Sequence, residues 1–318
     1  MENIDMVIEK VINSFLFHCQ YEKNLNQKTL KAYQTDLGQF AAFMKQLLKK
    51  RMVNELNKED VKNYLQEISV FKPKTVKRKI ASLKAMFNFL EYENDHFINP
   101  FRKIKIRFRE PYTLPTVLNM REIKKIIRLV YQEKEELADT ERYSFRAVVR
   151  NIAVIELLFA TGIRVSELCN LKTEEVDLRG GKIKVFGKGS KERVIQICQS
   201  EVLAALRDYY RLFMTDIKGR HFFFINRLGA PLSTQSVRLM VREYTRKAGI
   251  TKRVTPHTFR HTFATLLLEE DVDIKYIQNL LGHSTISTTQ IYTHVNSGKQ
   301  KKILATKHPR RKMSFKQD

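Results

Sequence analysis

The sequence predicts a mainly α-helical protein with a small β-sheet, divided into two domains. Its length of 318 residues corresponds to about two domains at roughly 150 residues each. Apolar residues recur at the spacing of a helix face through the first hundred residues and in several later segments. One later stretch, residues 176–197, changes to strand-like runs around a glycine-rich turn, and this change predicts the sheet.

The composition is that of a globular chain. It is 43% hydrophobic and 29% charged, which excludes a disordered tail protein, and 11 Gly with 7 Pro exclude a collagen-like chain. No apolar run approaches the roughly 18 residues of a membrane span, and the first ten residues contain no apolar block like that of a signal peptide. The three cysteines are odd in number and share no CxxC spacing. We therefore expect a reduced, cytoplasmic protein with no membrane partner.

Charge is the strongest compositional signal. The chain has 58 Lys and Arg against 34 Asp and Glu, a formal net charge of +24. A protein this basic usually binds a polyanion, and nucleic acid is preferred here over a membrane surface or an acidic protein. The alternative is a generally basic, solvated surface, because charge alone identifies no chemistry.

Residues 1–101 are expected to form a small helical bundle. Helices are predicted over 26–49, over 58–68 with Asn57 as the N-cap, and over 75–91. The last helix has the clearest apolar stripe, with steps of 4, 3, 4 and 3 residues. The stripe comprises Val76, Ile80, Leu83, Phe87 and Leu90.

Basic side chains predict where this region contacts DNA. Four of them lie off the apolar stripe of the last helix and would form one basic face. A linker is predicted over 102–115, where basic residues alternate with apolar ones before Pro111 and Pro115; an edge strand is the alternative. The expected phosphate contacts are Lys74, Lys77, Arg78, Lys84, Arg102, Lys103 and Lys105.

Residues 116–318 are expected to form the second domain. Gly162 follows a predicted helix and can end it in the left-handed conformation. Two β runs flank residues 187–190, which predicts a hairpin with Lys188 at its tip. The predicted helices are 119–132, 142–160, 200–213 and 233–247, with a short strand at 222–225.

A candidate phosphate site lies at the start of another predicted helix. Thr255 is a suitable N-cap and Pro256 suits the first helical position. His257 and Arg260 are then three residues apart on one face of the first turn. Free N–H groups and the helix dipole favour an anion there, and an Arg fork would bind it. The alternative for an isolated HxxR is a solvated face.

A metal site is the competing interpretation of this helix. His257 and His261 are four residues apart, as in zinc helices of the HExxH type. Here Thr, Phe and Arg stand between them, and no carboxylate lies nearby in the sequence. A fixed cation beside a metal ion is unfavourable, so we expect no metal and a structural role for His261.

Further candidates stand elsewhere in the second domain. Arg164 lies just past a predicted helix end, and Glu167 is three residues on and could hold it. Gly282 closes a helix directly before His283. Ser287 and Gln290 have the spacing of a capping box, which would place Tyr292 within a short helix. Alone, a tyrosine in a helix is usually a core or surface residue.

Together these residues suit attack on a DNA phosphodiester. The pentacoordinate transition state gathers negative charge, which Arg164 and Arg260 could neutralise with His257 and His283 as donors. The nucleophile would be a tyrosine hydroxyl, whose free pKa is about 10 and which needs activation.

The remaining proton transfer needs an acid. Lys188, a mobile lysine near a cationic cluster, could protonate the leaving 5′-oxygen. The positive charges are built into the chain, so no metal and no other cofactor is required.

Five segments in this order carry a close resemblance: TGIRVSEL, FGKGSKER, TPHTFRHTFAT, LGHS and STTQIYTHV. They resemble the tyrosine recombinase (phage integrase) family, and the chain is similar to bacterial Xer-type recombinases. The residues that match its catalytic motifs are Arg164, Lys188, His257, Arg260, His283 and the nucleophile Tyr292, with Glu167 as the supporting acid.

The resemblance implies a fold and a reaction. It implies a SAM-like core-binding domain over 1–101 and a catalytic domain over 116–318 that clamp duplex DNA. It further implies a 3′-phosphotyrosine at Tyr292, a Holliday junction, a homo- or hetero-tetramer on a specific site, and accessory proteins for some members. Integration or excision of a mobile element and resolution of DNA dimers both remain open.

The chain departs from the usual Xer pattern in three places. Its 133–143 segment looks longer, Gln196 stands where Pro is usual, and an extension RKMSFKQD follows the HPR motif. These departures leave the chemistry intact but put a chromosome-dimer role in doubt. A type IB topoisomerase-like relaxing enzyme and a non-catalytic DNA-binding protein of the same fold are the alternatives.

Overall fold

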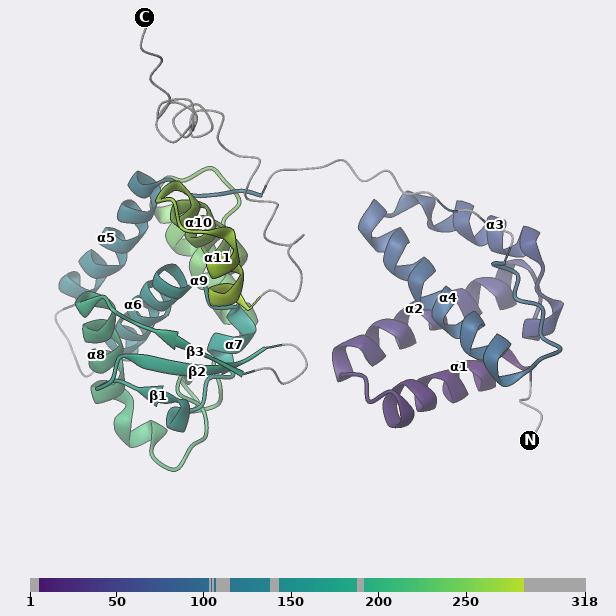
Figure 1. The fold of residues 1–318 in the computed structure, drawn as a ribbon, viewed down its shortest axis with the longest axis horizontal. Helices are drawn as coiled ribbons and strands as arrows, with labels where there is room; N and C mark the ends of the chain where they lie inside the picture. Colours follow the sequence, from purple (N-terminus) through teal and green to yellow (C-terminus); the bar gives the residue numbers. More distant parts are fainter. Residues whose placement is uncertain are drawn as a thin grey trace, which may run out of the picture. The chain divides into compact units, whose positions relative to one another are not determined.

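The computed structural model describes residues 6–102, 104, 106, 115–137, 143–187 and 192–282. The chain divides into two compact units, Met1–Tyr112 and Thr113–Asp318. Each unit has a hydrophobic core of its own, and the described part is mainly helical with one three-stranded sheet (Figure 1). None of the helices in the described ranges is both long and apolar enough to cross a membrane.

The first unit contains four α-helices with local caps. Asn26 accepts a hydrogen bond from the N–H of Thr29, and Asn57 accepts from Glu59 and Asp60, so both predicted N-termini are confirmed. The helices are α1 (Ile8–Phe17), α2 (Gln27–Leu47), α3 (Lys58–Glu67) and α4 (Pro73–Glu93). Short helical turns lie at His18–Glu22, Val53–Glu55 and Ile68–Val70.

Helix α4 confirms the predicted apolar stripe. Ile80, Leu83, Phe87 and Leu90 are buried in the core of the unit, and Val76 packs at its edge. The helix begins two residues earlier than predicted because a proline occupies its first turn, where its fixed φ is favourable.

A buried carboxylate joins α2 to α4. Asp36 is fully buried and pairs with Arg78, accepts from the Ser82 hydroxyl at 2.9 Å, and lies 3.7 Å from the Lys79 Nζ. Arg78 was expected to contact phosphate, but one of its donors already serves this internal pair. The Lys79 ammonium is also buried, so the Asp36 charge is the nearest compensation for it.

The segment after α4 begins against the first unit. Phe97 and Phe101 are buried there, and Ile104 and Ile106 pack on the same core. The predicted linker over 102–115 therefore starts with apolar side chains that are held by packing.

The second unit surrounds a central helix, α6, which packs against α5, α8 and α10. Two helices run about one turn further than predicted, to residues 136 and 217. The helices are α5 (Met120–Glu136), α6 (Tyr143–Thr161), α7 (Val165–Cys169), α8 (Ser200–Ile217), α9 (Thr234–Lys247), α10 (Pro256–Glu269) and α11 (Ile274–Leu281), with a 3₁₀ turn at Thr173–Glu175.

The sheet is antiparallel, in the order β1 (Val176–Asp177), β2 (Lys182–Phe186), β3 (Glu192–Gln196). The predicted hairpin is confirmed, with Lys182 opposite Gln196 and Phe186 opposite Glu192. Figure 1 shows α7 and α11 near one end of this sheet.

The predicted strand at 222–225 is wrong. This segment forms only isolated bridges, Phe222 with Lys172 and Ile225 with Pro231. Its backbone groups are divided among several partners: the buried Tyr209 hydroxyl donates to the Phe223 carbonyl and accepts from the Ile225 N–H. Because its backbone N–H and C=O groups bind these separate partners, the segment forms no continuous ladder of hydrogen bonds with another strand.

Replacing Asp36 by Ala should lower the free energy of unfolding of the first unit by about 3–5 kcal/mol, because Lys79 would stay buried without its opposite charge. Amide hydrogen exchange in α2 and α4 of the full chain measures this change. Glu59→Ala is the control, since Glu59 and Lys62 form an exposed pair, and it should change stability by less than about 0.5 kcal/mol. Similar losses in both variants would contradict the prediction.

Candidate active site

Arg164 is positioned by a tight turn after α6. The turn passes through Gly162, which has a φ of +59° and lies so close to α10 and α11 that a Cβ would stand 2.7 Å from a Phe263 ring carbon and 2.9 Å from Leu281. Glycine is therefore required for conformation and for space. Arg164 then takes the N-cap position of α7.

Glu167, in the first turn of α7, holds Arg164 as the three-residue spacing predicts. Its Oε2 accepts the Arg164 backbone N–H at 3.0 Å, and its Oε1 accepts from the Arg164 Nη1 at 2.7 Å. The Glu167 side chain is only 3% exposed. Burial alone would raise its pKa, but hydrogen bonds from Arg193 and Arg164 and the Arg193 charge outweigh burial and lower the pKa below the usual value. Glu167 is therefore ionised at neutral pH.

Arg193 on β3 is a member of the site that sequence reasoning missed. It binds Glu167 in a bidentate manner, at 2.9 Å to Oε1 and 2.8 Å to Oε2. A signal was present in the strand alternation: Arg193 shares a face with the buried Ile195, so a charged residue on the inward side needed a buried partner.

Arg260 is buried, at 3% exposure, on the first turn of α10. The turn begins as predicted, with the Thr255 hydroxyl accepting from the Thr258 N–H and Pro256 at the first helical position. The Arg260 Nη1 donates to the Gly162 carbonyl at 2.8 Å, and its Nη2 donates to the Leu281 carbonyl at 2.6 Å. This side chain thereby joins the end of α6 to the end of α11.

Three guanidinium groups converge on the C-terminal end of α11, which closes at Gly282 with a φ of +65°. The carbonyls of residues 280, 281 and 282 have no partners within the helix and present its negative pole. The acceptor and donor pairs are Leu280 with Arg193 Nε at 3.2 Å, Leu281 with Arg260 Nη2 at 2.6 Å, and Gly282 with Arg164 Nη2 at 2.7 Å.

His257 lies at the exposed edge of this cluster. Partial burial and the charges of Arg260, Arg238 and Arg164 lower its pKa below the ordinary value of 6.5. The imidazole is therefore neutral at pH 7 in the free protein and can accept a proton. Arg238, on the exposed face of α9, is a second basic residue that the sequence analysis did not single out.

His261 lies deeper on α10. Burial and the neighbouring His257 and Arg260 lower its pKa to about 4, so it stays neutral across the physiological range. Within the described part of the chain, no group of three or more His, Cys, Asp or Glu could hold a metal ion.

The structure thus brings together four of the expected site residues, Arg164, Glu167, His257 and Arg260. The others, Lys188, His283 and Tyr292, lie outside the described residues, as do Lys103 and Lys105.

The predicted DNA-contact residues of the first unit that are described lie on or after α4. Lys74, Lys77 and Arg78 are exposed and Lys84 is half-buried. Arg102 pairs with Glu91, with Nε and Oε1 2.5 Å apart.

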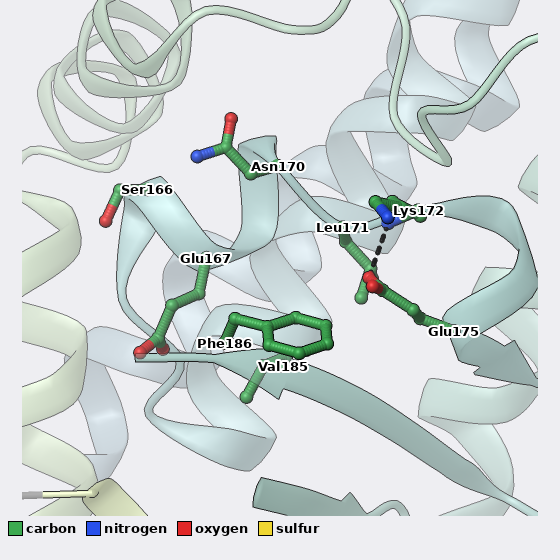
Figure 2. Close-up of a pocket in the computed structure, with 8 residues that line it drawn as sticks. All are labelled: Ser166, Glu167, Asn170, Leu171, Lys172, Glu175, Val185 and Phe186. Carbon is green, nitrogen blue, oxygen red and sulfur yellow. Dashed lines mark hydrogen bonds between the residues drawn. The ribbon is translucent and has the colours of Figure 1, made fainter. Parts of the chain in front are cut away.

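A cavity of about 260 Å³ borders the site between α7 and β2. Figure 2 shows Ser166 and Glu167 on α7, Asn170 directly after it, and Val185 and Phe186 on β2. Its lining includes Glu167 but neither Arg164 nor Arg260. The cavity therefore adjoins the arginine cluster without being lined by Arg164 or Arg260.

Replacing Arg238 by Gln should raise the pKa of His257, because it removes one of the three positive charges that disfavour protonation. The pKa of His261 should remain about 4, because burial, His257 and Arg260 determine it. NMR of the imidazole groups against pH in the free, full-length protein measures both. An unchanged His257 titration in this variant would disprove the assignment of Arg238 to the cluster.

Two family models match the chain. The phage integrase family matches residues 128–299, and the phage integrase N-terminal SAM-like domain matches residues 12–94. These matches run from the middle of α1 to the end of α4 in the first unit and cover most of the second.

Curated relatives match over nearly the whole chain. A tyrosine recombinase of Agathobacter rectalis is 46% identical over 96% of this chain and 98% of its own length. The tyrosine recombinase XerD of Listeria monocytogenes is 35% identical over 94% of this chain and 99% of its own. XerC of Staphylococcus haemolyticus is 34% identical over 97% of this chain and 100% of its own.

Solved structures share the fold. XerH bound to a palindromic difH substrate matches with a TM-score of 0.72 and 20% identity, over 96% of this chain and 98% of that one. The XerA recombinase matches with a TM-score of 0.52 and 29% identity, over 95% and 99%. The chain belongs to the phage integrase family and, within it, is a tyrosine recombinase of the Xer type.

Proposed function

We propose that the arginine cluster binds the scissile phosphate of a DNA recombination site and that Tyr292 is the nucleophile. The observation that carries the proposal is the convergence of Arg164, Arg260 and His257, from the turn before α7 and from α10, beside the chain segment that leads to Tyr292. The curated relatives are tyrosine recombinases, enzymes that cleave and rejoin DNA.

The chemistry follows from these charges. The phenolic oxygen of Tyr292 forms a bond to phosphorus while the bond to the 5′-oxygen breaks, which leaves a 3′-phosphotyrosine and a free 5′-hydroxyl. Arg164 and Arg260 stabilise the negative charge that accumulates on the nonbridging oxygens. Lys188 supplies the proton to the 5′-oxygen. The phosphodiester energy is kept in the covalent link, so rejoining needs no ATP.

His257 has two possible protonation states in this scheme. The lowered pKa makes it neutral in the free protein, which suits acceptance of the Tyr292 proton. Serving as a hydrogen-bond donor to phosphate needs only the neutral ring's N–H, and an incoming phosphate would raise the pKa by offsetting the arginine charges. His283 is proposed as a second donor to the phosphate.

Duplex DNA is the proposed partner, with the exposed lysines of α4 as phosphate contacts. The structural relatives include XerH bound to difH DNA and a lambda integrase dimer bound to a core site. A net charge of +24 and the basic face at Lys74, Lys77 and Lys84 support binding to the backbone of such a site. Arg78 and Arg102 are also proposed contacts, and each pairs with an acidic side chain in this structure.

Recombination would require several copies on DNA. We propose that four protomers act in pairs through a Holliday junction, with accessory proteins according to the host element. The integrase of the transposon Tn1549 is among the similar structures, and Xer proteins are among the curated relatives. These relatives support both a role in a mobile element and a role in resolving DNA dimers.

Tyr292→Phe should bind a nicked suicide substrate as the wild type does but form no covalent complex, because only the hydroxyl is lost. Denaturing electrophoresis of protein trapped on labelled DNA measures the complex. Equal trapping by both proteins would move the nucleophile elsewhere.

Strand exchange tests the recombinase function itself. The purified wild type should join two marked duplexes that carry its site. Relaxation of any supercoiled plasmid without joining would instead establish a topoisomerase.

Lys74→Gln with Lys77→Gln should lower the salt dependence of DNA affinity, reducing the slope of log K against log salt by about 2. Fluorescence anisotropy with one duplex between low and physiological salt measures the slope. The control is Lys58→Gln with Lys62→Gln on α3, which removes the same charge and should leave the slope nearly unchanged. Equal slopes in the two variants would exclude the α4 face as the footprint.

A further inference from the structure

We infer that Arg193 is a positioning residue for DNA cleavage, acting through Glu167 on Arg164. The inference rests on the proposed function, because it assigns Arg193 to the same phosphate site. The Arg193 side chain on β3 is only 14% exposed, and its described hydrogen bonds go to Glu167 and to the Leu280 carbonyl.

Glu167 is fully used by its two arginine neighbours. A carboxylate has about four lone-pair positions, and four N–H donors lie within hydrogen-bond distance of this one. Oε1 receives the Nη1 groups of Arg164 and Arg193, and Oε2 receives the Arg164 backbone N–H and the Arg193 Nη2.

The sharing of the Glu167 carboxylate between Arg164 and Arg193 sets the orientation of the Arg164 side chain. Because Arg193 occupies both oxygens, the Arg164 side chain reaches Glu167 through one nitrogen only and directs Nη2 away from it, to the Gly282 carbonyl. Without Arg193, the buried Glu167 would have two empty acceptor positions. A bidentate pair with Arg164 would fill one of them, on Oε2, and this pair would turn the guanidinium away from the α11 end.

Arg193 also connects two parts of the proposed machinery. It stands opposite Val185 in the β2–β3 hairpin, whose tip carries Lys188 in the sequence. Its Nε donates to the Leu280 carbonyl, three residues before His283. One side chain therefore ties the hairpin, the Arg164 support and the end of α11 to a single carboxylate.

The test is a single-turnover cleavage assay on a nicked suicide duplex at saturating protein, with DNA affinity measured in parallel. Arg193→Gln should lower the cleavage rate on the order of 10²-fold and change Kd by less than about 3-fold, since small displacements of a catalytic group are costly to rate. Arg193→Lys keeps the charge and one bond to Glu167, and it should recover part of the rate, to within about 10-fold of wild type.

Whether the effect of Arg193→Gln on the cleavage rate depends on Arg164 distinguishes a positioning role from a general structural effect. In an Arg164→Lys background, Arg193→Gln should slow cleavage less than about 3-fold further, because the group it positions is already changed. The thermal unfolding transition of every variant is measured, and the assay temperature is set below it. If Arg193→Gln does not fold, Arg193→Lys takes its place in the double-mutant comparison with Arg164→Lys. Lys184→Gln is the matched control, because Lys184 pairs with Glu192 on the exposed side of the same hairpin and should cleave within about 2-fold of wild type.

The outcomes are distinct. Wild-type rates in Arg193→Gln, or the same fold-loss in both backgrounds, would overturn the role of Arg193. A wild type that never traps DNA would instead overturn the proposed function.

Discussion

The site depends on how the protein compensates an excess of buried positive charge. Arg193 and Arg260 are mostly shielded from water and Arg164 is half-buried, and Glu167 accepts hydrogen bonds from Arg164 and Arg193. Further compensation comes from the carbonyls at the negative end of α11. Neutral dipoles compensate a charge less completely than an anion does, so the cluster suits the phosphate that we propose it binds.

The same contacts determine the local architecture. Arg260 joins the turn at Gly162 to the end of α11, and Arg193 joins the hairpin to α7. The groups that we propose bind phosphate are thus also the connections between the elements that carry them. A rigid, preorganised arrangement of this kind stabilises transition-state charge without reorganisation at the moment of reaction.

The first unit also contains buried charges, but there a carboxylate is compensated by basic side chains. Asp36 receives Arg78, Lys79 and Ser82 from α4, so its buried charge is matched within one pair of helices. This arrangement fixes the register of α2 against α4 and leaves Lys74 and Lys77 on the exposed side. Stability and the proposed DNA contacts therefore lie on the same helix but use different residues.

The sequence by itself determined the features that depend on neighbours in the chain. The caps at Asn57 and Thr255, the α4 stripe, the left-handed glycines and the hairpin all arise from interactions over a few residues, and they appear where predicted. The order of the motifs also identified Arg164, His257 and Arg260. The roles of Lys188, His283 and Tyr292 stay predictions, because those residues lie outside the described ranges.

Only the tertiary structure decided which charges meet. Arg193 and Glu167 are 26 residues apart, and Arg78 and Asp36 are 42 apart, so no local pattern specifies either pair. The division of the 222–225 backbone between Tyr209 and several other partners has the same origin. Burial makes such pairing obligatory, but the packing of distant elements selects the partner.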